Sequence, residues 1–596
     1  MTKKINITIN GAELTVDQGT TILDAAQKLG IKIPVLCYHK DLCIAGNCRV
    51  CVVEVAGVSK LFAACATPVW EGMDILTNSL MVRNSRKHVI ELLLSEHNAD
   101  CTKCYKNGNC ELQELAAEYK ITNQDFIDLI HSHDYTIDGF SPSILKDDSR
   151  CIRCQRCVRT CDELQSVGAL TVAHKGDHMK ISTFFNKPIS EVVCTNCGQC
   201  VIHCPTGALI ERNYIEEVWD AIGDPEKHVV VQTAPAVRIG LGEALKLKPG
   251  ERVTGKMVAA LRRLGFNSVL DTDFTADLTI LEEGTELLHR LKSIIVDNDN
   301  KHPLPMTTSC SPGWVKFFEH IYPDLMPHMS TCKSPQQMFG ALAKTFYARK
   351  IGVDPEKIVS VSIMPCTAKK YEANRPEMRD SGFKDVDYVL TTRELAIMIQ
   401  QAGIEFNDLP EEHYDSIMGA STGAGVIFGA TGGVMEAALR TVYEIVTGRE
   451  VPFENLNITP VRGFDGVKEA TIKIEGTVPD YKFLEGVEVK CCVAHGLANA
   501  RSVMDNVKAG KADYHFIEIM ACPGGCLGGG GQPIPTTPEI RKKRIEAIYT
   551  EDTSMSLRKS HENPEVVQLY KEFLGEPYGN LSHKLLHTEY FERQRY

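Results

Sequence analysis

Residues 151–161 read CIRCQRCVRTC, and residues 194–205 read CTNCGQCVIHCP. Both segments have the spacing C-x2-C-x2-C-x3-C, and a proline follows the second one directly. Reduced cysteines with this spacing are typical metal ligands, because thiolates on one short stretch of chain can reach the same metal centre. The repeat therefore predicts a small metal-binding domain, which we place at residues 141–215.

Disulfides are the alternative explanation for the 23 cysteines in this chain of 596 residues. They require an oxidising compartment and are concentrated in small secreted domains that lack a large core. Here 43% of the residues are hydrophobic, and the N-terminal sequence MTKKINITINGAELTV lacks the apolar segment of a secretory signal. We therefore interpret the clustered cysteines as metal ligands and expect a cytoplasmic protein.

The composition excludes several other classes of protein. A length of 596 residues predicts several domains. The formal net charge of −12 offers no basic surface for nucleic acid. No apolar run approaches the ~18 residues of a membrane-spanning helix, so we expect no membrane span.

The repeated spacing is that of bacterial ferredoxins with two 4Fe–4S clusters, in which the fourth cysteine of each run binds the other cluster. Zinc would not explain such a repeat. We expect one 4Fe–4S cluster to be bound by Cys151, Cys154, Cys157 and Cys204. The other should be bound by Cys194, Cys197, Cys200 and Cys161.

Residues 1–80 hold another four cysteines at the spacing C-x10-C-x2-C-x13-C: Cys37, Cys48, Cys51 and Cys65. Before them, KINITIN and ELTV alternate around the turn signal Asn10-Gly11, and TTILDAAQKLG has the cap and end residues of a short helix. This order resembles the β-grasp fold of plant-type 2Fe–2S ferredoxins. The gap between Cys37 and Cys48 is wider than the first gap of plant ferredoxins and is similar to that in the 2Fe–2S module of hydrogenases and respiratory complex I.

Cys43 lies inside this gap and is not part of the motif. We expect it to be a buried free thiol.

Residues 81–140 contain HNADCTKCYKNGNC, which offers one imidazole and three thiols: His97, Cys101, Cys104 and Cys110. These side chains would also suit tetrahedral zinc, so the residues alone leave zinc and iron–sulfur open. The preceding VRNSRKHVIELLLSEH has the pattern of an amphipathic helix. The whole segment resembles the 4Fe–4S module of hydrogenases and complex I that has one histidine and three cysteine ligands. An imidazole in place of a thiolate removes one negative charge and should tune the cluster potential.

Residues 228–596 have a different pattern, in which strand-like apolar runs alternate with helices such as TGKMVAALRRLG. The runs include HVVVQTAPAVR, KIVSVSIMPC, EVKCCVAHG and YHFIEIMAC. This alternation is typical of an α/β domain, whose active site lies at the carboxyl ends of its strands. Several of the runs end at cysteines. We therefore expect a large catalytic α/β domain within a multidomain protein of α+β and α/β class.

Three segments of this domain carry its chemistry: TTSCSPGW (307–314), MPCTAKKYE (364–372) and EIMACPGGCLGGGGQP (518–533). They resemble the three signature segments of iron-only (FeFe) hydrogenases. The active centre of that family is the H-cluster, a 4Fe–4S cubane joined through a cysteine thiolate to a diiron site with CO and cyanide ligands. The resemblance covers nearly the whole chain, including the accessory cluster motifs. It implies the reaction 2H+ + 2e− ⇌ H2.

The resemblance also implies roles for individual residues. Cys366 and Cys522 would bind the cubane, and Cys526 would bridge it to the diiron site. The glycines of CPGGC would let the backbone approach a bulky cluster. Lys369 would donate a charge-assisted hydrogen bond to a diatomic ligand. The remaining pocket residues would be Met364, Met520 and Gln336.

The pair Cys310-Ser311 departs from the family pattern TSCCP, in which the first cysteine relays protons and the second binds the cubane. If the pair is aligned with the family pattern residue by residue, which we call the strict register, Cys310 relays protons and Ser311 occupies the ligand position. Serine is a poor, hard ligand. In the alternative register Cys310 binds the cubane and the serine relays protons. We favour the strict register.

A proton relay is the last implication of the resemblance, and it would run through Cys310, Glu283, Ser330 and Glu286, with Arg290 near its surface end. The segment TILEEGTELLHR places Glu283, Glu286 and Arg290 at i, i+3 and i+7, on one face of a helix. Without the family match, a solvated surface face would be the preferred interpretation of this trio.

The sequence leaves the electron partners open. The glycine-rich segment STGAGVIFGATGGVMEAALR lacks GxGxxG spacing, and no GK[ST] phosphate loop occurs in the chain. NAD(P) reactivity would therefore need flavin-containing partner subunits, and we favour a hetero-oligomer of this type over a single-chain, ferredoxin-dependent hydrogenase. The rival from another class is a non-catalytic iron–sulfur protein: a sensor, an assembly factor or an electron-transfer subunit like that of complex I.

Overall fold

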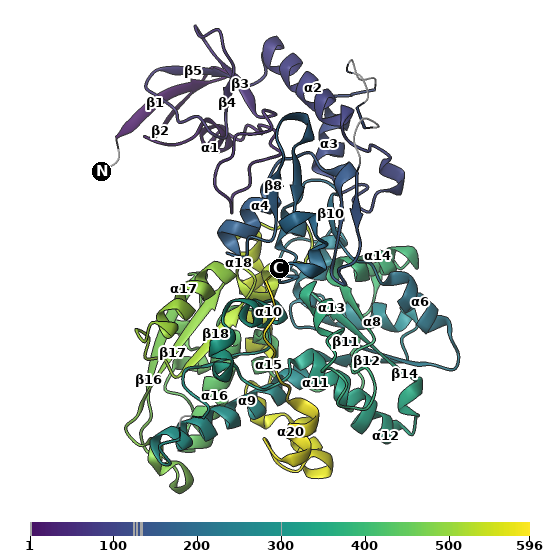
Figure 1. The fold of residues 1–596 in the computed structure, drawn as a ribbon, viewed down its shortest axis with the longest axis vertical. Coiled ribbons are helices and arrows are strands. Elements are labelled where there is room, and N and C mark those ends of the chain that lie inside the picture. Colours follow the sequence, from purple (N-terminus) through teal and green to yellow (C-terminus); the bar gives the residue numbers. More distant parts are fainter. Residues whose placement is uncertain (1–2, 123–125, 127–128, 131–134, 300, 596) are drawn as a thin grey trace.

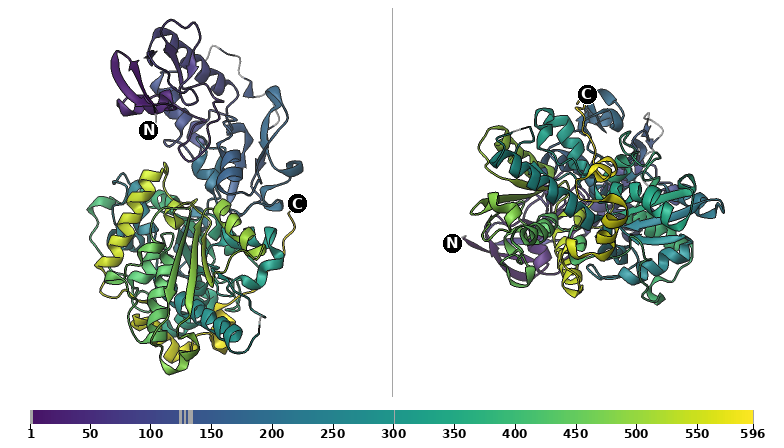
Figure 2. Two further views of the ribbon diagram at one scale, coloured as in Figure 1. Left: turned by 90° about the vertical axis from the view of Figure 1, so that its left-hand side faces the viewer. Right: turned by 90° about the horizontal axis from the view of Figure 1, so that it is seen from below.

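The computed structural model describes residues 3–122, 126, 129–130, 135–299 and 301–595. Figure 1 shows the N-terminal domains (purple to blue) stacked at one end of a larger lobe (teal to yellow), and Figure 2 shows the same arrangement from two other directions. None of the helices within the described ranges combines the length and the apolar composition needed to cross a bilayer.

The predicted N-terminal hairpin forms around Asn10 and Gly11, whose φ angles are 50° and 82°. It belongs to a sheet in the order β2-β1-β5-β3-β4, made of β1 (Lys4–Ile9), β2 (Ala12–Asp17), β3 (Val52–Val55), β4 (Phe62–Ala63) and β5 (Met73–Leu76). The side chain of Thr21 caps α1 (Ile22–Lys28), whose apolar residues join the core of the sheet. The β-grasp prediction is confirmed.

Cys43 corrects one expectation, because its side chain is exposed and not buried. Its thiol donates to Glu163 Oε1 over 2.8 Å, and its backbone N–H donates to Glu163 Oε2 over 3.2 Å. The loop that carries Cys43 faces the neighbouring ferredoxin-like domain, so a polar contact replaces burial in the core.

The second module is built around α2 (Leu80–Ser95), which begins at the cap Ser79 and delivers His97 two residues after its end. α3 (Glu111–Glu118) packs against it. Several residues of the predicted range 81–140, namely 123–125, 127–128 and 131–134, lie outside the described residues.

Each cysteine run of the two-cluster domain includes a short helix, α4 (Arg156–Arg159) with Cys157 and α5 (Gln199–His203) with Cys200. β7 (Ile144–Asp147) and β10 (Leu209–Glu211) pair antiparallel at the two ends of this domain's sequence. The core between these elements includes Ile144, Val201 and Leu209 together with several of the cysteines.

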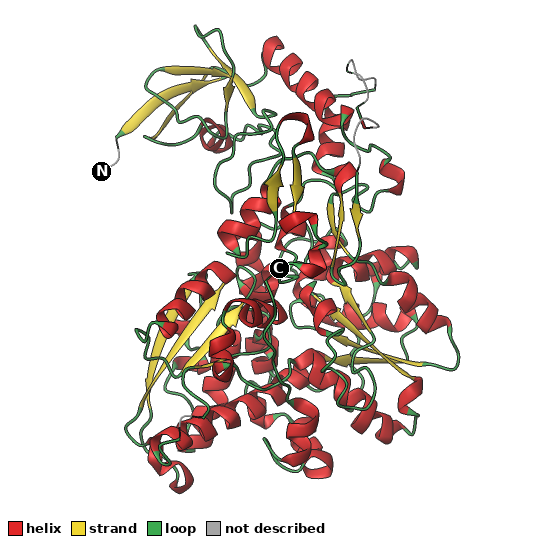
Figure 3. Cartoon of the chain, in the orientation of Figure 1, coloured by secondary structure: helices red, strands yellow, loops and turns green. Residues whose placement is uncertain are grey.

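The large domain contains two four-stranded sheets, with helices covering their outer faces (Figure 3). The first is wholly parallel, in the order β12-β11-β14-β15, and consists of β11 (His228–Thr233), β12 (Ser268–Asp271), β14 (Ile358–Met364) and β15 (Tyr388–Thr391). The second has the order β13-β18-β17-β16 and consists of β13 (Met306–Thr307), β16 (Val467–Lys473), β17 (Glu488–His495) and β18 (Phe516–Met520). Only β16 runs antiparallel to its neighbour.

Helices between and around these sheets position the residues of the site. Figure 1 places α9, α10 and α11 between the two sheets. Residues of the site lie on α9 (Thr272–Ile295), α10 (Pro312–Ile321), α11 (Pro335–Leu342) and α13 (Ala368–Glu372). Later in the chain follow α18 (Pro538–Ser554) and α20 (Asn580–Leu586). Of the described residues 580–595, those up to Leu586 form α20 and the rest are not helical.

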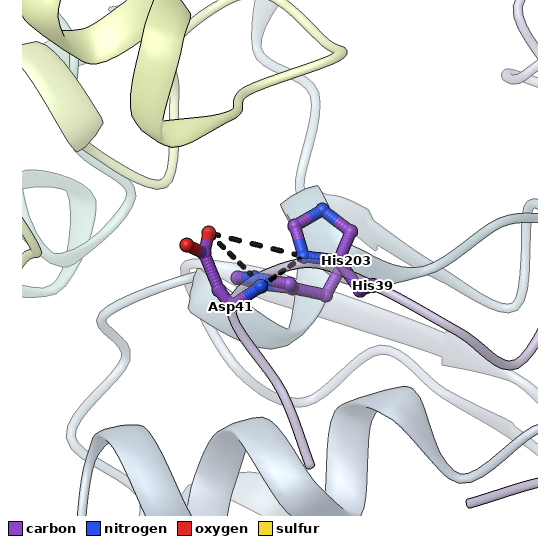
Figure 4. Close-up of side chains that lie close together, drawn as sticks. All are labelled: His39, Asp41 and His203. Carbon is purple, nitrogen blue, oxygen red and sulfur yellow. Dashed lines mark hydrogen bonds and ion pairs between the residues drawn. The ribbon is translucent and has the colours of Figure 1, made fainter. Parts of the chain in front are cut away.

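His39 and Asp41 of the N-terminal loop form a cluster with His203 of the ferredoxin-like domain, drawn in Figure 4. The large domain contacts this cluster through Arg541. Asp41 Oδ2 lies 3.8 Å from His39 Nδ1 and 3.7 Å from His203 Nε2. Both carboxylate oxygens also accept from Arg541 on α18, over 2.7 and 2.9 Å. The donor set resembles that of a metal site, but the guanidinium already supplies the positive charge. We therefore interpret the cluster as an interdomain contact.

Replacing Asp41 with asparagine should loosen this contact. The Arg541 side chain is 4% exposed, so the substitution leaves a buried guanidinium without a counter-charge, at a cost of about 3–5 kcal/mol. Hydrogen exchange should accelerate in the loop around residue 41 and in the first turn of α18. Asp17→Asn, which removes an exposed partner of Lys4, should leave exchange there unchanged. Equal exchange in both variants would contradict this account of the contact.

Candidate active site

The site is a cavity between the two sheets of the large domain. It is reached by the loops that leave the carboxyl ends of several parallel strands. Its lining includes Ala234 and Pro235 after β11, Cys310 after β13, Cys366 after β14 and Cys522 after β18. The position agrees with the rule that α/β sheets bind ligands beyond the carboxyl ends of their strands.

Three thiols from distant parts of the sequence face this cavity: Cys366, Cys522 and Cys526. Burial raises the pKa of each one, to about 12 for Cys526, and the nearby thiols contribute to the shift at Cys522 and Cys526. A metal centre that binds these thiols would therefore have to displace their protons. Three soft sulfur ligands in a largely apolar cavity suit an iron–sulfur centre.

The backbone around the cavity is packed so closely that side chains are excluded at two glycines. A Cβ atom on Gly525, whose φ is 83°, would lie 2.7 Å from the backbone N of Thr431. One on Gly529 would lie 2.1 Å from the carbonyl O of Pro365, beside Cys366. Glycine at these positions lets the cysteine-bearing turns come together around one site.

Lys369 and Gln336 are held at the cavity by Glu372, a residue that the sequence interpretation did not single out. Glu372 Oε2 accepts from Lys369 Nζ over 2.9 Å and from Gln336 Nε2 over 3.0 Å. Lys369 Nζ also donates to the carbonyl O of Cys310 over 3.2 Å. Gln336 Oε1 is buried without a hydrogen-bond partner in the described part of the chain, as expected of a group that faces a bound cofactor. The i, i+3 spacing of Lys369 and Glu372 is the sequence signal that could have revealed this pair.

His495, at the end of β17, is a second residue that sequence reasoning missed. Its Nδ1 accepts from the backbone N–H of Gly524 over 3.2 Å, and its Nε2 lies 3.2 Å from the carbonyl O of Phe464. Burial lowers the pKa of His495 to about 4, so the ring is neutral and can accept at one nitrogen while donating at the other. It thereby fixes the CPGGC turn.

Cys310 and Ser311 lie next to each other on the cavity wall but have different neighbours. The Ser311 hydroxyl accepts from the backbone N–H of Ala521 over 3.2 Å, which places it beside Cys522. The Cys310 thiol interacts with the charges of Glu283 and Lys369, and burial raises its pKa well above the usual value. Cys310 thus interacts with Glu283 of α9, whereas Ser311 is hydrogen-bonded to the backbone next to Cys522.

The acidic residues of α9 are buried, and the interpretation of this face as a solvated surface is wrong. Burial raises the pKa of Glu283 to about 8, against the opposing effect of the nearby Ser330 hydroxyl. The Ser330 hydroxyl donates to Glu286 Oε2 over 3.0 Å, and Arg290 donates to Glu286 Oε1. Arg290, expected near the surface, is itself 3% exposed, because its guanidinium also donates to backbone carbonyls.

The accessory cysteines gather in the predicted sets. One cavity is lined by Cys151, Cys154, Cys157 and Cys204. Another is lined by Cys161, Cys194, Cys197 and Cys200. Cys197 lines both the second cavity and the cavity of the active site, so the two sites share a wall.

The two N-terminal cysteine groups are also assembled. Cys51 Sγ lies 3.4 Å from Cys65 Sγ, and hydrogen bonds from Cys48 and Cys65 lower the pKa of Cys37. In the second group, burial raises the pKa of Cys101 and of Cys110, and the nearby Cys104 thiol adds to both shifts. His97 Nδ1 is buried without a hydrogen-bond partner in the described residues, which suits a metal ligand.

Family models match five consecutive parts of the chain. The model for the C-terminal domain of the iron-only hydrogenase large subunit matches residues 227–530, and the model for the iron hydrogenase small subunit matches residues 538–593. Before them lie a 2Fe-2S cluster binding domain (2–79), an NADH-ubiquinone oxidoreductase-G iron-sulfur binding region (86–125) and the ferredoxin-like domain of NADH-quinone oxidoreductase subunit 3 (141–210). The zinc alternative for the second module is therefore not supported.

Relatives match the chain over its full length. It is 52% identical to the NADP-reducing hydrogenase subunit HndD of Solidesulfovibrio fructosivorans, covering 99% of each chain. It is 40% identical to iron hydrogenase 1 of Clostridium pasteurianum, covering 98% of this chain and 99% of that one. A solved structure of a variant of the [FeFe]-hydrogenase HydA1 from Chlamydomonas reinhardtii matches with 44% identity and a TM-score of 0.57, covering 63% of this chain and 98% of that one.

These matches cover both the accessory modules and the catalytic domain, and they do not favour a non-catalytic sensor or a complex I-like subunit. The cofactors are an H-cluster, a 2Fe–2S cluster and 4Fe–4S clusters. The chain belongs to the iron-only hydrogenases, which form and oxidise H2.

Proposed function

We propose that this chain is the hydrogen-activating subunit of a cytoplasmic, NAD(P)-linked hetero-oligomer. The observation that carries the proposal is the full-length match to a subunit of an NADP-reducing hydrogenase, accessory modules included. The chain itself has neither a GK[ST] phosphate loop nor a GxGxxG fingerprint in its glycine-rich segment. Electrons from H2 therefore pass to a flavin-containing partner that reduces NAD(P).

The electron route follows from contacts between the cysteine groups. The Arg159 guanidinium donates to the carbonyl O of Cys37 over 2.6 Å and lies 3.5 Å from that of Cys154, so it joins the 2Fe–2S loop to the first ferredoxin cavity. The second module reaches the same cavity, because the N–H of Glu111 donates to the carbonyl O of Pro205 over 3.0 Å. The 2Fe–2S loop and the second module thus both contact the 4Fe–4S site of Cys151, Cys154, Cys157 and Cys204. From there the route continues through the second 4Fe–4S site, whose Cys197 also lines the active-site cavity.

The H-cluster, when bound, supplies the metal chemistry that combines protons and electrons into H2. Cys366 and Cys522 would hold its cubane and Cys526 would link it to the diiron site, while Met364 and Met520, which line the cavity, would shield it. The ammonium group of Lys369 is fixed by two hydrogen bonds and retains a third donor for a diatomic ligand.

The proton relay runs from Cys310 through Glu283 and Ser330 to Glu286. A carboxyl group with a pKa of about 8 exchanges protons readily near neutral pH, which makes Glu283 a suitable general acid and base. The different neighbours of Cys310 and Ser311 support the strict register, in which Cys310 would serve the relay and Ser311 would stand at the cubane.

Copurification tests the proposed assembly. The natively purified chain should bring a flavin-containing subunit with it, and the complex should reduce NAD+ or NADP+ with H2. The isolated chain should oxidise H2 with an artificial dye but reduce no nicotinamide. A natively monomeric protein that reduces only ferredoxin would overturn the proposal.

Glu283→Gln tests the relay. Loss of the carboxyl should lower the rate of H2 evolution by about 10²–10⁴-fold. The CO and cyanide infrared bands should remain, because the cavity keeps its shape. Glu283→Asp, which retains a shorter carboxyl, should recover part of the rate. Full activity of the glutamine variant would exclude Glu283 from the relay.

Cys310→Ala separates the two registers. The strict register predicts an unchanged iron content and an unchanged electron paramagnetic resonance signal of the cubane, together with a large loss of turnover. The alternative register predicts that the cubane itself is lost. In the strict register Ser311→Cys should alter the cubane signal, since it exchanges an oxygen ligand for sulfur.

A further inference from the structure

The outer end of the proposed relay reaches a group that cannot take over a proton. Glu286 receives hydrogen bonds from Arg290, Ser330 and Thr331. The guanidinium of Arg290 is always charged and has no acceptor atom. It can hold the Glu286 carboxylate in place but cannot accept a proton from it. A proton that arrives at Glu286 therefore needs another way out.

The C-terminal segment provides an imidazole one hydroxyl group away from Glu286. Thr331 Oγ1 lies 3.2 Å from Glu286 Oε2 and 2.8 Å from His587 Nδ1. A short antiparallel bridge between Cys332 and His587 fixes this arrangement. Its backbone hydrogen bonds run from Thr588 N to Thr331 O and from Lys333 N to Leu586 O, each over 2.8 Å.

The far side of the His587 ring meets a buried carboxylate. His587 Nε2 lies 3.2 Å from Glu282 Oε2, and neither side chain is more than 1% exposed. Glu282 is fixed by the hydroxyls of Tyr570 and Ser582 and by the backbone N–H of Tyr578. An imidazolium at residue 587 would therefore have an opposite charge at hydrogen-bond distance.

We propose that Thr331 and His587 extend the proton relay beyond Glu286, an inference that rests on the relay under the proposed function. In the outward direction, the proton on Glu286 Oε2 passes to Thr331 Oγ1 while the Thr331 hydroxyl proton passes to His587 Nδ1. Glu286 becomes a carboxylate, and His587 becomes an imidazolium paired with Glu282. The inward direction reverses both transfers, so no charge is created without a partner.

Solvent lies close to this extension of the relay through Thr331 and His587, which we call the His587 branch. The ring of His583, an exposed residue of α20, stacks on the His587 ring with centroids 4.6 Å apart and an interplanar angle of 7°. A proton at His587 is thus one side chain from bulk water. The titratable and charged groups that surround the ring from all sides are Glu282, Glu286, Arg290, Cys332, Tyr570, Tyr578 and His583.

His587→Gln and Thr331→Val test the branch in the matured enzyme. Glutamine keeps the polarity of the site without an ionisable ring, and valine keeps the shape of threonine without its hydroxyl. Each should lower kcat for H2 evolution by about tenfold or more and raise the solvent deuterium isotope effect. Each should also change the pH profile of kcat, with unaltered CO and cyanide infrared bands. The double variant should be no slower than the slower single one, because both act on one path.

Two control variants distinguish the role proposed for Thr331 and His587 from the relay that ends at Glu286. His561→Gln, in the same C-terminal region beside Glu444, should leave kcat and its pH profile unchanged. Glu286→Gln should abolish most turnover, and if it does not, the relay under the proposed function fails. If Glu286→Gln is inactive but His587→Gln keeps the normal rate, pH profile and isotope effect, the inference alone is overturned. Protons would then reach solvent directly at half-buried Thr331.

Discussion

The carboxyl ends of β14 and β18 open into one cavity, and the loops that leave them carry Cys366 and Cys522. Their thiols can meet only because β14 and β18, strands of two separate sheets, end at the same place. Cys526 joins them through the turn that follows Cys522, where Gly525 has a positive φ of 83°. Every other part of the molecule is arranged around this meeting of three thiols.

Buried ion pairs hold the loops of the cavity to the helices behind them. Lys370 Nζ lies 2.8 Å from Glu394 Oε2, and both side chains are fully buried. Arg375 is paired with Glu319 of α10 over 2.8 Å. Buried pairs add little net stability compared with apolar packing, but breaking one is costly. Their effect here is to fix the segment that follows Cys366 in a single position, which a rigid metal centre requires.

The sequence allowed much of this arrangement to be predicted, because cysteine spacing and strand patterns are local properties. The hairpin at Asn10-Gly11, β11, β14, β17 and β18 form where alternation or apolar runs indicated strands. The exposure of Cys43 and the burial of Arg290 were not predictable, since they depend on neighbours from other domains or distant loops. The same holds for His495 and for Arg541, whose partners lie 29 and 500 residues away. Tertiary contacts of this kind leave no periodic signal in the chain.

Cys366, Cys522 and Cys526 should bind one iron centre within this cavity. Anomalous diffraction from the matured protein, recorded on both sides of the iron absorption edge, can test this. We expect a compact group of iron atoms in contact with all three sulfur atoms and a separate iron–sulfur site beyond Cys197. Zinc at these sulfur atoms, or iron bound to none of them, would contradict it.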